Sequence, residues 1–283
     1  MLKILVTGAT GNVGQEVLRL LLSQDCDVCA AVRNLKSAKQ ILGSSIQSVV
    51  FDFTNPDTFV NAFENVNKLF LVRPPALANV RKQIAPALNA AKLAGVEHIV
   101  FLSILGAERN RFVPHSKIER YIDQLGIRAT FLRCSFFMQN LNTTHREDIK
   151  TRGELLLPAG KGKTSFIDVR DIAAVAVRTL IEDGHQRRAY ALTGGEALTY
   201  YEVADIFTSV LGKRVRYNPS LLKFVRQMCS SGLPIDFVLV MVAIYTTARL
   251  GLAGDITSDT EQLLNRSPLT IRQYVEDYQQ FWL

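Results

Sequence analysis

Short apolar segments alternate with helix-length segments through the first half of the chain. Strands are predicted where mostly apolar residues stand together, at 3–7, 27–32, 48–51, 68–72, 98–102 and 128–132. Strands that are apolar along their whole length are typical of a parallel sheet buried on both faces. Apolar positions at helical spacing predict helices at 13–22 and 78–94. The pattern therefore predicts an α/β fold, a Rossmann-type doubly wound parallel sheet with helices on both faces.

The spacing of apolar segments changes after Arg133. Short strands are predicted at 155–157, 164–167 and 189–192, and helices at 169–181 and 199–211. Thr199 followed by Glu202 has the spacing of a capping box, and the rest of the chain is predicted to be mostly helical. We therefore predict a Rossmann domain at 1–135 and a smaller, mostly helical substrate lobe at 136–283, part of which can return to the sheet.

A glycine-rich turn follows the first predicted strand. Its sequence is Gly8-Ala9-Thr10-Gly11-Asn12-Val13-Gly14, and it leads into the first predicted helix. In dinucleotide-binding folds the first glycine allows a tight turn and the second lets a pyrophosphate approach the helix N-terminus. The third glycine lets the helix pack on the strand. The strand–turn–helix context supports dinucleotide binding at this turn, and the alternative is a plain glycine-rich turn.

The residues after the second and third predicted strands bear on which dinucleotide would bind. NAD sites usually place an acidic side chain at the end of the second strand, but here Arg33 follows it. A planar guanidinium suits a 2′-phosphate, so NADP(H) is preferred, with NAD(H) as the alternative. Asp52 and Phe53 follow the third strand, where an adenine would lie, and they offer a carboxylate and a backbone N–H.

Composition and charge exclude several classes of protein. The net charge is +7, but the basic residues are scattered, which favours a phosphate-bearing ligand over nucleic acid. The longest apolar run, Phe237 to Tyr245, is too short to span a membrane, and the N-terminus lacks the features of a signal peptide. The chain is therefore predicted to be cytoplasmic. Four cysteines and four histidines show no metal-ligand spacing, so no metal is predicted.

The glycine spacing matches the T-G-x-x-G-x-x-G form of short-chain dehydrogenase/reductases. Further segments sharpen the match: 30–33, 69–75, 98–103, 133–140, 166–173 and 190–198. Together they resemble the NmrA-like family of atypical short-chain dehydrogenase/reductases. That family includes quinone and dye reductases, isoflavone-type reductases and redox-sensing regulators without known turnover. The resemblance extends over nearly the whole chain and does not specify a substrate.

The resemblance implies a set of cofactor contacts. They are Gly8, Thr10, Gly11, Asn12, Val13, Gly14, Arg33, Asp52, Phe53, Val72 and Arg73, with Ser103 beside the nicotinamide ribose. It also suggests an aromatic substrate wall at Phe136, Phe137 and Phe166, for which core packing is the alternative. Cys134 stands where the family usually has proline, and the sequence leaves the reactivity of its thiol open.

The catalytic residues of conventional short-chain enzymes are only partly present. Those enzymes use a Ser, a Tyr and a Lys four residues after the Tyr. Lys117 resembles the lysine that many NmrA-like reductases retain, but Val113 stands at the tyrosine position. Ser103, His115 and Lys117 remain. Lys117 would position the ribose and His115 would supply a proton, because an unperturbed imidazole titrates near neutrality. The alternative for both is a plain helix-start residue.

Three functions follow from these features. The first is an NADPH-dependent reductase that transfers hydride to a quinone or a similar conjugated small molecule. The second is a non-catalytic NADP(H) sensor that acts through a protein partner, motivated by the missing tyrosine. The third, an enzyme like the sugar-nucleotide epimerases, is disfavoured because its chemistry needs a base at the sugar hydroxyl. The oligomeric state is not predicted.

Overall fold

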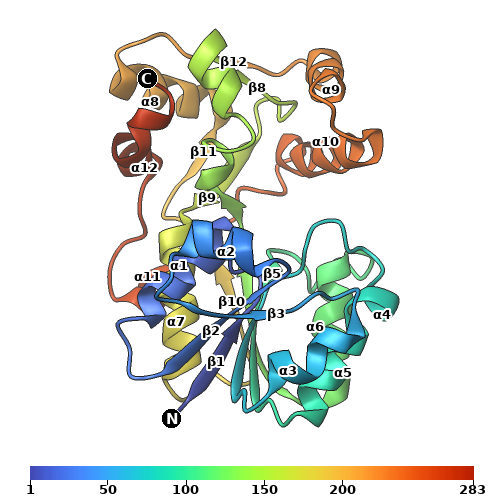
Figure 1. The fold of residues 1–283 in the computed structure, drawn as a ribbon. Helices are drawn as coiled ribbons and strands as arrows, with labels where there is room; N and C mark the ends of the chain where they lie inside the picture. Colours follow the sequence, from blue (N-terminus) through green and yellow to red (C-terminus); the bar gives the residue numbers. More distant parts are fainter. The chain divides into compact units, whose positions relative to one another are not determined.

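A seven-stranded parallel sheet is the largest element of this computed structural model, which describes residues 1–283 (Figure 1). The strand order is β10-β6-β5-β4-β1-β2-β3. The strands are β1 Lys3–Val6, β2 Asp27–Val32, β3 Gln47–Val50, β4 Lys68–Leu71, β5 His98–Ile104, β6 Arg128–Cys134 and β10 Arg188–Leu192. The predicted fold class is confirmed, because every strand pair in this sheet is parallel.

Helices cover both faces of this sheet, as Figure 1 shows. Helices α1 and α7 pack against each other on one face, and α3, α5 and α6 pack on the other. The helices are α1 Asn12–Leu21, α2 Leu35–Leu42, α3 Phe59–Phe63, α4 Val80–Gln83, α5 Ala85–Leu93, α6 Pro114–Leu125 and α7 Val169–Ile181, with a 3₁₀ turn at Pro56–Thr58. Parallel strands buried from both sides explain the apolar runs in the sequence.

The single helix predicted at 78–94 is wrong in its extent. The segment forms two helices, α4 and α5, which are separated at Ile84. Pro86 lies in the first turn of α5. A proline has no N–H to donate, and its ring clashes with the carbonyl four residues earlier, so it is tolerated in a first turn and not in a helix interior. Pro86 therefore marks the start of a new helix.

The chain divides into two compact units. The first comprises residues 1–134 and 169–192, and the second comprises 135–168 and 193–283. The segment 169–192 carries α7 and β10 and belongs to the first unit, where β10 pairs with β6 in parallel. Parallel pairing requires a crossover connection, and α7 lies in the segment that connects the two strands.

The second unit is mostly helical, with two small sheets. Its strands are β7 Phe136–Phe137, β8 Glu154–Leu156, β9 Lys163–Ile167, β11 Ala197–Thr199 and β12 Arg216–Asn218. Its helices are α8 Tyr200–Leu211, α9 Leu221–Ser230, α10 Ile235–Arg249, α11 Asp259–Leu264 and α12 Ile271–Tyr278, with short turns at Met138–Asn140, Asp148–Arg152 and Gln279–Phe281. The predicted capping box at Thr199 and Glu202 is confirmed at the start of α8.

The core of the second unit is rich in aromatic side chains. Trp282 is fully buried, and its ring packs edge-on against Phe207 at 4.7 Å between centroids. Tyr200 is buried and contacts the ring of Tyr217 at 5.7 Å. This unit therefore has a hydrophobic core of its own. None of the helices in the structure has both the length and the apolar character needed to cross a bilayer.

Candidate functional site

The strand order reverses between β1 and β4, which are neighbours in the sheet. The chain runs from β1 to β2 and β3 on one side, and then to β4, β5 and β6 on the other. Ligands of open α/β sheets bind at this reversal, beyond the carboxyl ends of the strands. Because the strands are parallel, the residues that follow them share one edge. The structure therefore brings the 8–14 turn, Arg33, Asp52 and Val72 to the same edge.

Each glycine of the 8–14 turn has a distinct structural reason. Gly8 has φ +62°, and a Cβ there would lie 2.8 Å from the Cβ of Val72. A Cβ at Gly14 would lie 2.2 Å from the carbonyl oxygen of Gly8, which excludes any side chain. A Cβ at Gly11 would lie 3.3 Å from the same oxygen, a tight but less severe contact. The turn is therefore closed by backbone approach, as the spacing predicted.

The start of α1 is built to leave backbone donors available. Gly11 is the N-cap residue and has no side chain to accept from the first turn, and no acidic residue lies in that turn. Thr10, Gly11 and Asn12 are exposed, whereas the side chain of Val13 is buried. The first N–H groups of a helix have no partner within the helix, and the helix dipole favours an anion beside them. The turn is therefore suited to a phosphate.

Thr7 links the two strands at the reversal, a role that the sequence did not reveal. Its backbone N–H and its hydroxyl both donate to the carbonyl oxygen of Phe70, at 2.9 and 3.1 Å. The N–H of Val72 in turn donates to the hydroxyl oxygen of Thr7 at 2.8 Å. The only sequence signal for this role was the position of Thr7, directly before Gly8 in the glycine motif. These bonds hold the ends of β1 and β4 in register beneath the glycine turn.

The residues after β2 and β3 differ in how strongly they are held. Arg33 is exposed at the end of β2. Asp52 accepts from the N–H and the hydroxyl of Thr54 at 2.8 and 2.7 Å. These bonds, with a smaller contribution from the charge of Arg33, lower the pKa of the Asp52 carboxyl. The Phe53 ring is buried edge-on against Phe51, at 4.8 Å between centroids, so only its backbone can serve a ligand.

Arg73 shapes the loop after β4. Its Nη1 donates to the carbonyl oxygens of Pro74, Pro75 and Leu77 at 2.9, 2.9 and 3.1 Å. Its Nε is buried without a hydrogen-bond partner, and burial lowers the pKa of the guanidinium. Arg73 is therefore primarily a clamp on its own loop.

His115 lies in the first turn of α6, and its ring stacks on Phe101 at 6.0 Å between centroids. Its Nδ1 is buried without a partner. Burial, together with the positive charge of Arg73, lowers the pKa of His115 to about 4. The ring is therefore neutral at neutral pH. The expectation of an imidazole that titrates near neutrality is wrong, because desolvation penalises the charged form.

A buried polar network lies between β5, α6 and β6. The hydroxyl of Ser103 donates to Oε1 of Glu119 at 2.6 Å, and both residues are buried. Arg133 donates to both oxygens of Glu119, at 3.2 Å from Nε and 2.7 Å from Nη2, and also lies 3.3 Å from Glu108. The sequence did not reveal Glu119, because nothing local distinguishes a paired buried glutamate from an exposed one. The proton of Ser103 is thus engaged by Glu119.

Lys117 is exposed in the first turn of α6, directly before the buried residues Ile118 and Glu119. Val113 is the N-cap residue of this helix, and Pro114 occupies the first position. A proline is suited to that position because the first N–H of a helix has no partner there. The helix therefore presents Lys117 to solvent without a tyrosine one turn before it.

The predicted aromatic residues belong to the second unit. Phe136 and Phe137 of β7 pair in parallel with Phe166 and Ile167 of β9. Phe136 and Phe137 are half-buried. Phe166 is buried, with its ring edge-on to Tyr200 at 5.3 Å. Phe166 is therefore a core residue, which was the alternative to its predicted place in a substrate wall. Phe136 and Phe137 keep accessible surface.

Cys134 ends β6 and is fully buried. Burial raises the pKa of its thiol far above the ordinary value. Because the thiolate is the reactive form, Cys134 is protected from oxidation in the folded chain. His, Cys, Asp and Glu side chains nowhere gather in threes that could hold a metal ion.

A protein-family model described as the NmrA-like family matches residues 2–264 of the chain. The chain belongs to the NmrA-like family. This confirms the resemblance that the glycine turn and the later segments indicated.

Several similar proteins cover nearly the whole chain. NAD(P)H azoreductase of Xenophilus azovorans is 33% identical over 278 residues, which is 96% of this chain and 96% of its own length. Quinone oxidoreductase 2 of Escherichia coli (strain K12) is 28% identical over 278 residues, 96% of this chain and 97% of its own. The structure of Citrobacter sp. triphenylmethane reductase complexed with NADP(H) matches with a TM-score of 0.86 at 28% identity and covers 97% of this chain and 99% of its own. Two of these relatives are named as reductases and one as an oxidoreductase, and NAD(P)H or NADP(H) is specified for the two reductases.

Proposed function

We propose that this protein is an NADPH-dependent reductase that transfers hydride to a quinone or a similar conjugated small molecule. The observation that carries the proposal is the closed glycine turn, in which a Cβ at Gly14 would lie 2.2 Å from the Gly8 carbonyl, beside the exposed Arg33. The glycine turn fits a pyrophosphate and Arg33 fits a 2′-phosphate. Its relatives include a quinone oxidoreductase and an azoreductase.

Different residues of the first unit would contact different parts of NADPH. The backbone of Thr10, Gly11, Asn12 and Val13 would hold the pyrophosphate at the start of α1, and Arg33 would pair with the 2′-phosphate. Asp52 and Phe53 are assigned to the adenine, and Val72 and Arg73 to the central part of the dinucleotide. Ser103 and Lys117 are assigned to the nicotinamide ribose. When bound, NADPH supplies the hydride.

The protein's own groups supply little acid catalysis. The proton of Ser103 is engaged by Glu119, which makes Ser103 a positioning residue. His115 is neutral at neutral pH and can offer only an imidazole N–H. Such a site suits an acceptor that is already electrophilic, because solvent can protonate the reduced product. Quinones and conjugated dyes meet this requirement, and simple ketones do not.

The test is an anaerobic assay of NADPH and NADH consumption against a panel of quinones, azo dyes and simple ketones, with parallel binding titrations. We expect turnover with the conjugated acceptors, a preference for NADPH, and no turnover with ketones. Lys117→Ala should raise KM for NADPH, and the exposed Arg81→Ala serves as a control of equal charge change. His115→Ala tests the imidazole N–H through kcat.

Two outcomes would overturn the proposal. Tight NADPH binding without turnover on any acceptor would favour the sensor that acts through a protein partner. The absence of dinucleotide binding would contradict both functions and the assignment of the glycine turn.

A further inference from the structure

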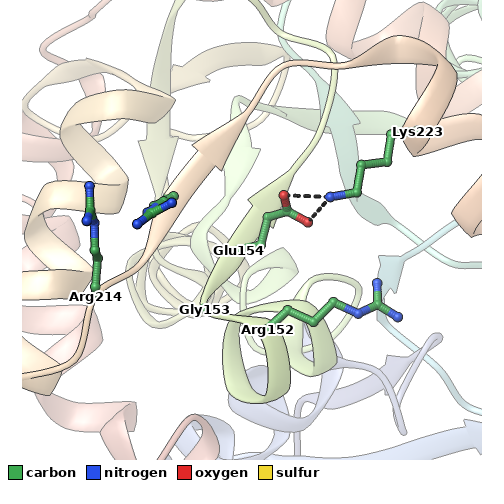
Figure 2. A pocket seen from close by; sticks show the side chains of 6 residues that line it. Arg152, Gly153, Glu154, Arg214 and Lys223 are labelled. Carbon is green, nitrogen blue, oxygen red and sulfur yellow. Dashed lines mark hydrogen bonds and ion pairs between the residues drawn. The ribbon is translucent and has the colours of Figure 1, made fainter.

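A cavity of about 460 Å³ lies within the second unit, at the amino-terminal ends of β8 and β12 (Figure 2). Its lining residues are Arg152, Gly153, Glu154, Arg214, Arg216 and Lys223. Four of these side chains are cations and one is a carboxylate. The function proposed above uses none of them.

The two lining cations Lys223 and Arg152 are already neutralised. Nζ of Lys223 lies 2.7 Å from each carboxylate oxygen of Glu154, and the amide of Asn218 also donates to Glu154 at 2.8 Å. Arg152 pairs with Asp148 at 3.0 Å. In Figure 2 both oxygens of Glu154 meet the Lys223 ammonium, and the side chain of Arg214 stands apart from them. The one carboxylate of the lining is therefore committed to Lys223.

Arg214 and Arg216 have no carboxylate partner. Both are exposed, and the residue between them, Val215, is buried. Both arginines line the same cavity, one on each side of the buried Val215. Like charges held together repel one another unless an anion offsets them. The cavity thus contains two unneutralised guanidinium groups.

The backbone beneath these arginines is held in place by the small β8–β12 sheet. Arg216 pairs in register with Glu154, and its N–H donates to the carbonyl oxygen of Gly153 at 2.8 Å. Gly153 has φ +58°, and a Cβ there would lie 2.6 Å from the carbonyl oxygen of Arg214. Only glycine allows this approach. Arg216 therefore lies on paired backbone, and the carbonyl group of Arg214, two residues earlier, packs against Gly153.

We propose that this cavity binds a small anion with at least two negative charges, of the phosphate-ester or diphosphate class. A guanidinium fork matches the geometry of phosphate oxygens and binds them with paired hydrogen bonds. The volume suits a small molecule, since ligand pockets span roughly 300–1,000 Å³. The site lies in the second unit, whereas the glycine turn lies in the first, so the inference does not depend on the reductase activity.

The test is isothermal titration calorimetry of the full chain with inorganic pyrophosphate at low salt, with and without excess NADP⁺. We expect one saturable site that persists with NADP⁺ present. Arg214→Ala/Arg216→Ala should weaken binding at least about tenfold, because both unpaired forks are lost. Lys161→Ala/Lys163→Ala removes two exposed lysines of the same unit that do not line the cavity, and should change binding less than about twofold. Glu154→Gln should tighten binding, because it releases Lys223.

Each other outcome overturns the site. Equal weakening by both double variants would mean that only the general positive field attracts the anion. Loss of the signal in the presence of NADP⁺ would place the pyrophosphate at the glycine turn. The absence of saturable binding would contradict the proposal directly. Because the arginines are exposed, a thermal melt identical to that of the unmodified chain verifies that each variant is folded.

Discussion

Side chains at the carboxyl edge of the sheet differ in whether neighbouring residues already hydrogen-bond to them. Ser103 donates to Glu119, Asp52 accepts from Thr54, and Arg73 clamps its own loop. Arg33 and Lys117, in contrast, are exposed and have no ion-pair partner within the chain. These two cations therefore remain available to a phosphate or a ribose.

Replacing Arg33 with alanine should change the choice between the two dinucleotides. We expect Kd for NADPH to rise about tenfold or more, because a charge-assisted pair with a 2′-phosphate is lost, while Kd for NADH stays within about twofold. Fluorescence titration with both dinucleotides measures the ratio. Lys36→Ala, an exposed cation in α2, is the matched control. An equal loss for NADPH and NADH would contradict the role of Arg33.

At the scale of elements, the turn between β1 and α1 depends on missing side chains. Gly14→Ala should abolish dinucleotide binding and destabilise the chain by roughly 2–3 kcal/mol, since its Cβ would meet the backbone of Gly8 and the helix would shift. Urea unfolding and dinucleotide titration are the measurements. Gly184→Ala is the control, because Gly184 has φ +88° with open space around it, so only backbone strain is added. That variant should bind the dinucleotide normally.

The network between β5, α6 and β6 couples three elements through one buried carboxylate. Glu119→Gln should lower the free energy of unfolding by about 3 kcal/mol, because Arg133 loses its buried partner and retains only Glu108. Glu182→Gln, which breaks a half-exposed pair with Arg178, should cost less than about 1 kcal/mol.

A substitution in the same network distinguishes whether Ser103 is a positioning residue or a proton donor. Ser103→Ala should lower stability by about 1 kcal/mol, the typical contribution of one hydrogen bond, and leave kcat within about tenfold. A much larger loss of kcat with unchanged KM would instead make Ser103 a proton donor.

At the scale of the whole molecule, both units bury neutral histidines. In the first unit, Thr130 donates its only hydroxyl proton to the carbonyl of His185, so Nε2 of His98 must donate to Thr130. In the second unit, Nε2 of His145 bonds the hydroxyl of Tyr245 at 2.6 Å. In each ring Nδ1 has no partner, so protonation would bury an unpaired N–H. Burial lowers the pKa of both histidines to about 4.

These histidines should make the protein sensitive to mild acid. In the unfolded chain each histidine takes up a proton below its ordinary pKa of about 6.5, whereas in the folded chain it does so only below about 4. The free energy of unfolding therefore falls as the pH decreases from about 6.5 to about 4. We expect a loss of about 2 kcal/mol for each buried histidine between pH 7 and pH 5. Urea unfolding at the two pH values measures it, and His145→Gln should remove its share of the difference. An unchanged difference in that variant would contradict the assignment.

Much of the fold and part of the site could be predicted from local pattern. All seven strands of the main sheet were predicted close to their observed positions. The glycine turn, the capping box at Thr199 and the cation at Arg33 were also found, because each depends on residues that are neighbours in sequence. The break at Ile84 was also encoded locally, by Pro86, and the apolar run across it concealed the break. The sequence allowed part of the C-terminal segment to return to the sheet but did not specify residues 169–192, because that return depends on long-range strand pairing.

The glycine spacing and the apolar periods were sufficient to predict a doubly wound sheet with a phosphate-binding turn, because both are backbone constraints set within a few residues. The sequence contained Ser103, Glu119, Arg133, His115 and Cys134 without revealing their states. Burial and partners distant in sequence set those states: Glu119 engages the Ser103 proton, and desolvation keeps His115 neutral and Cys134 protonated. Local constraints therefore determined the framework, whereas the protonation and pairing of its polar groups followed from folding, because desolvation and pairing act between residues that only folding brings together.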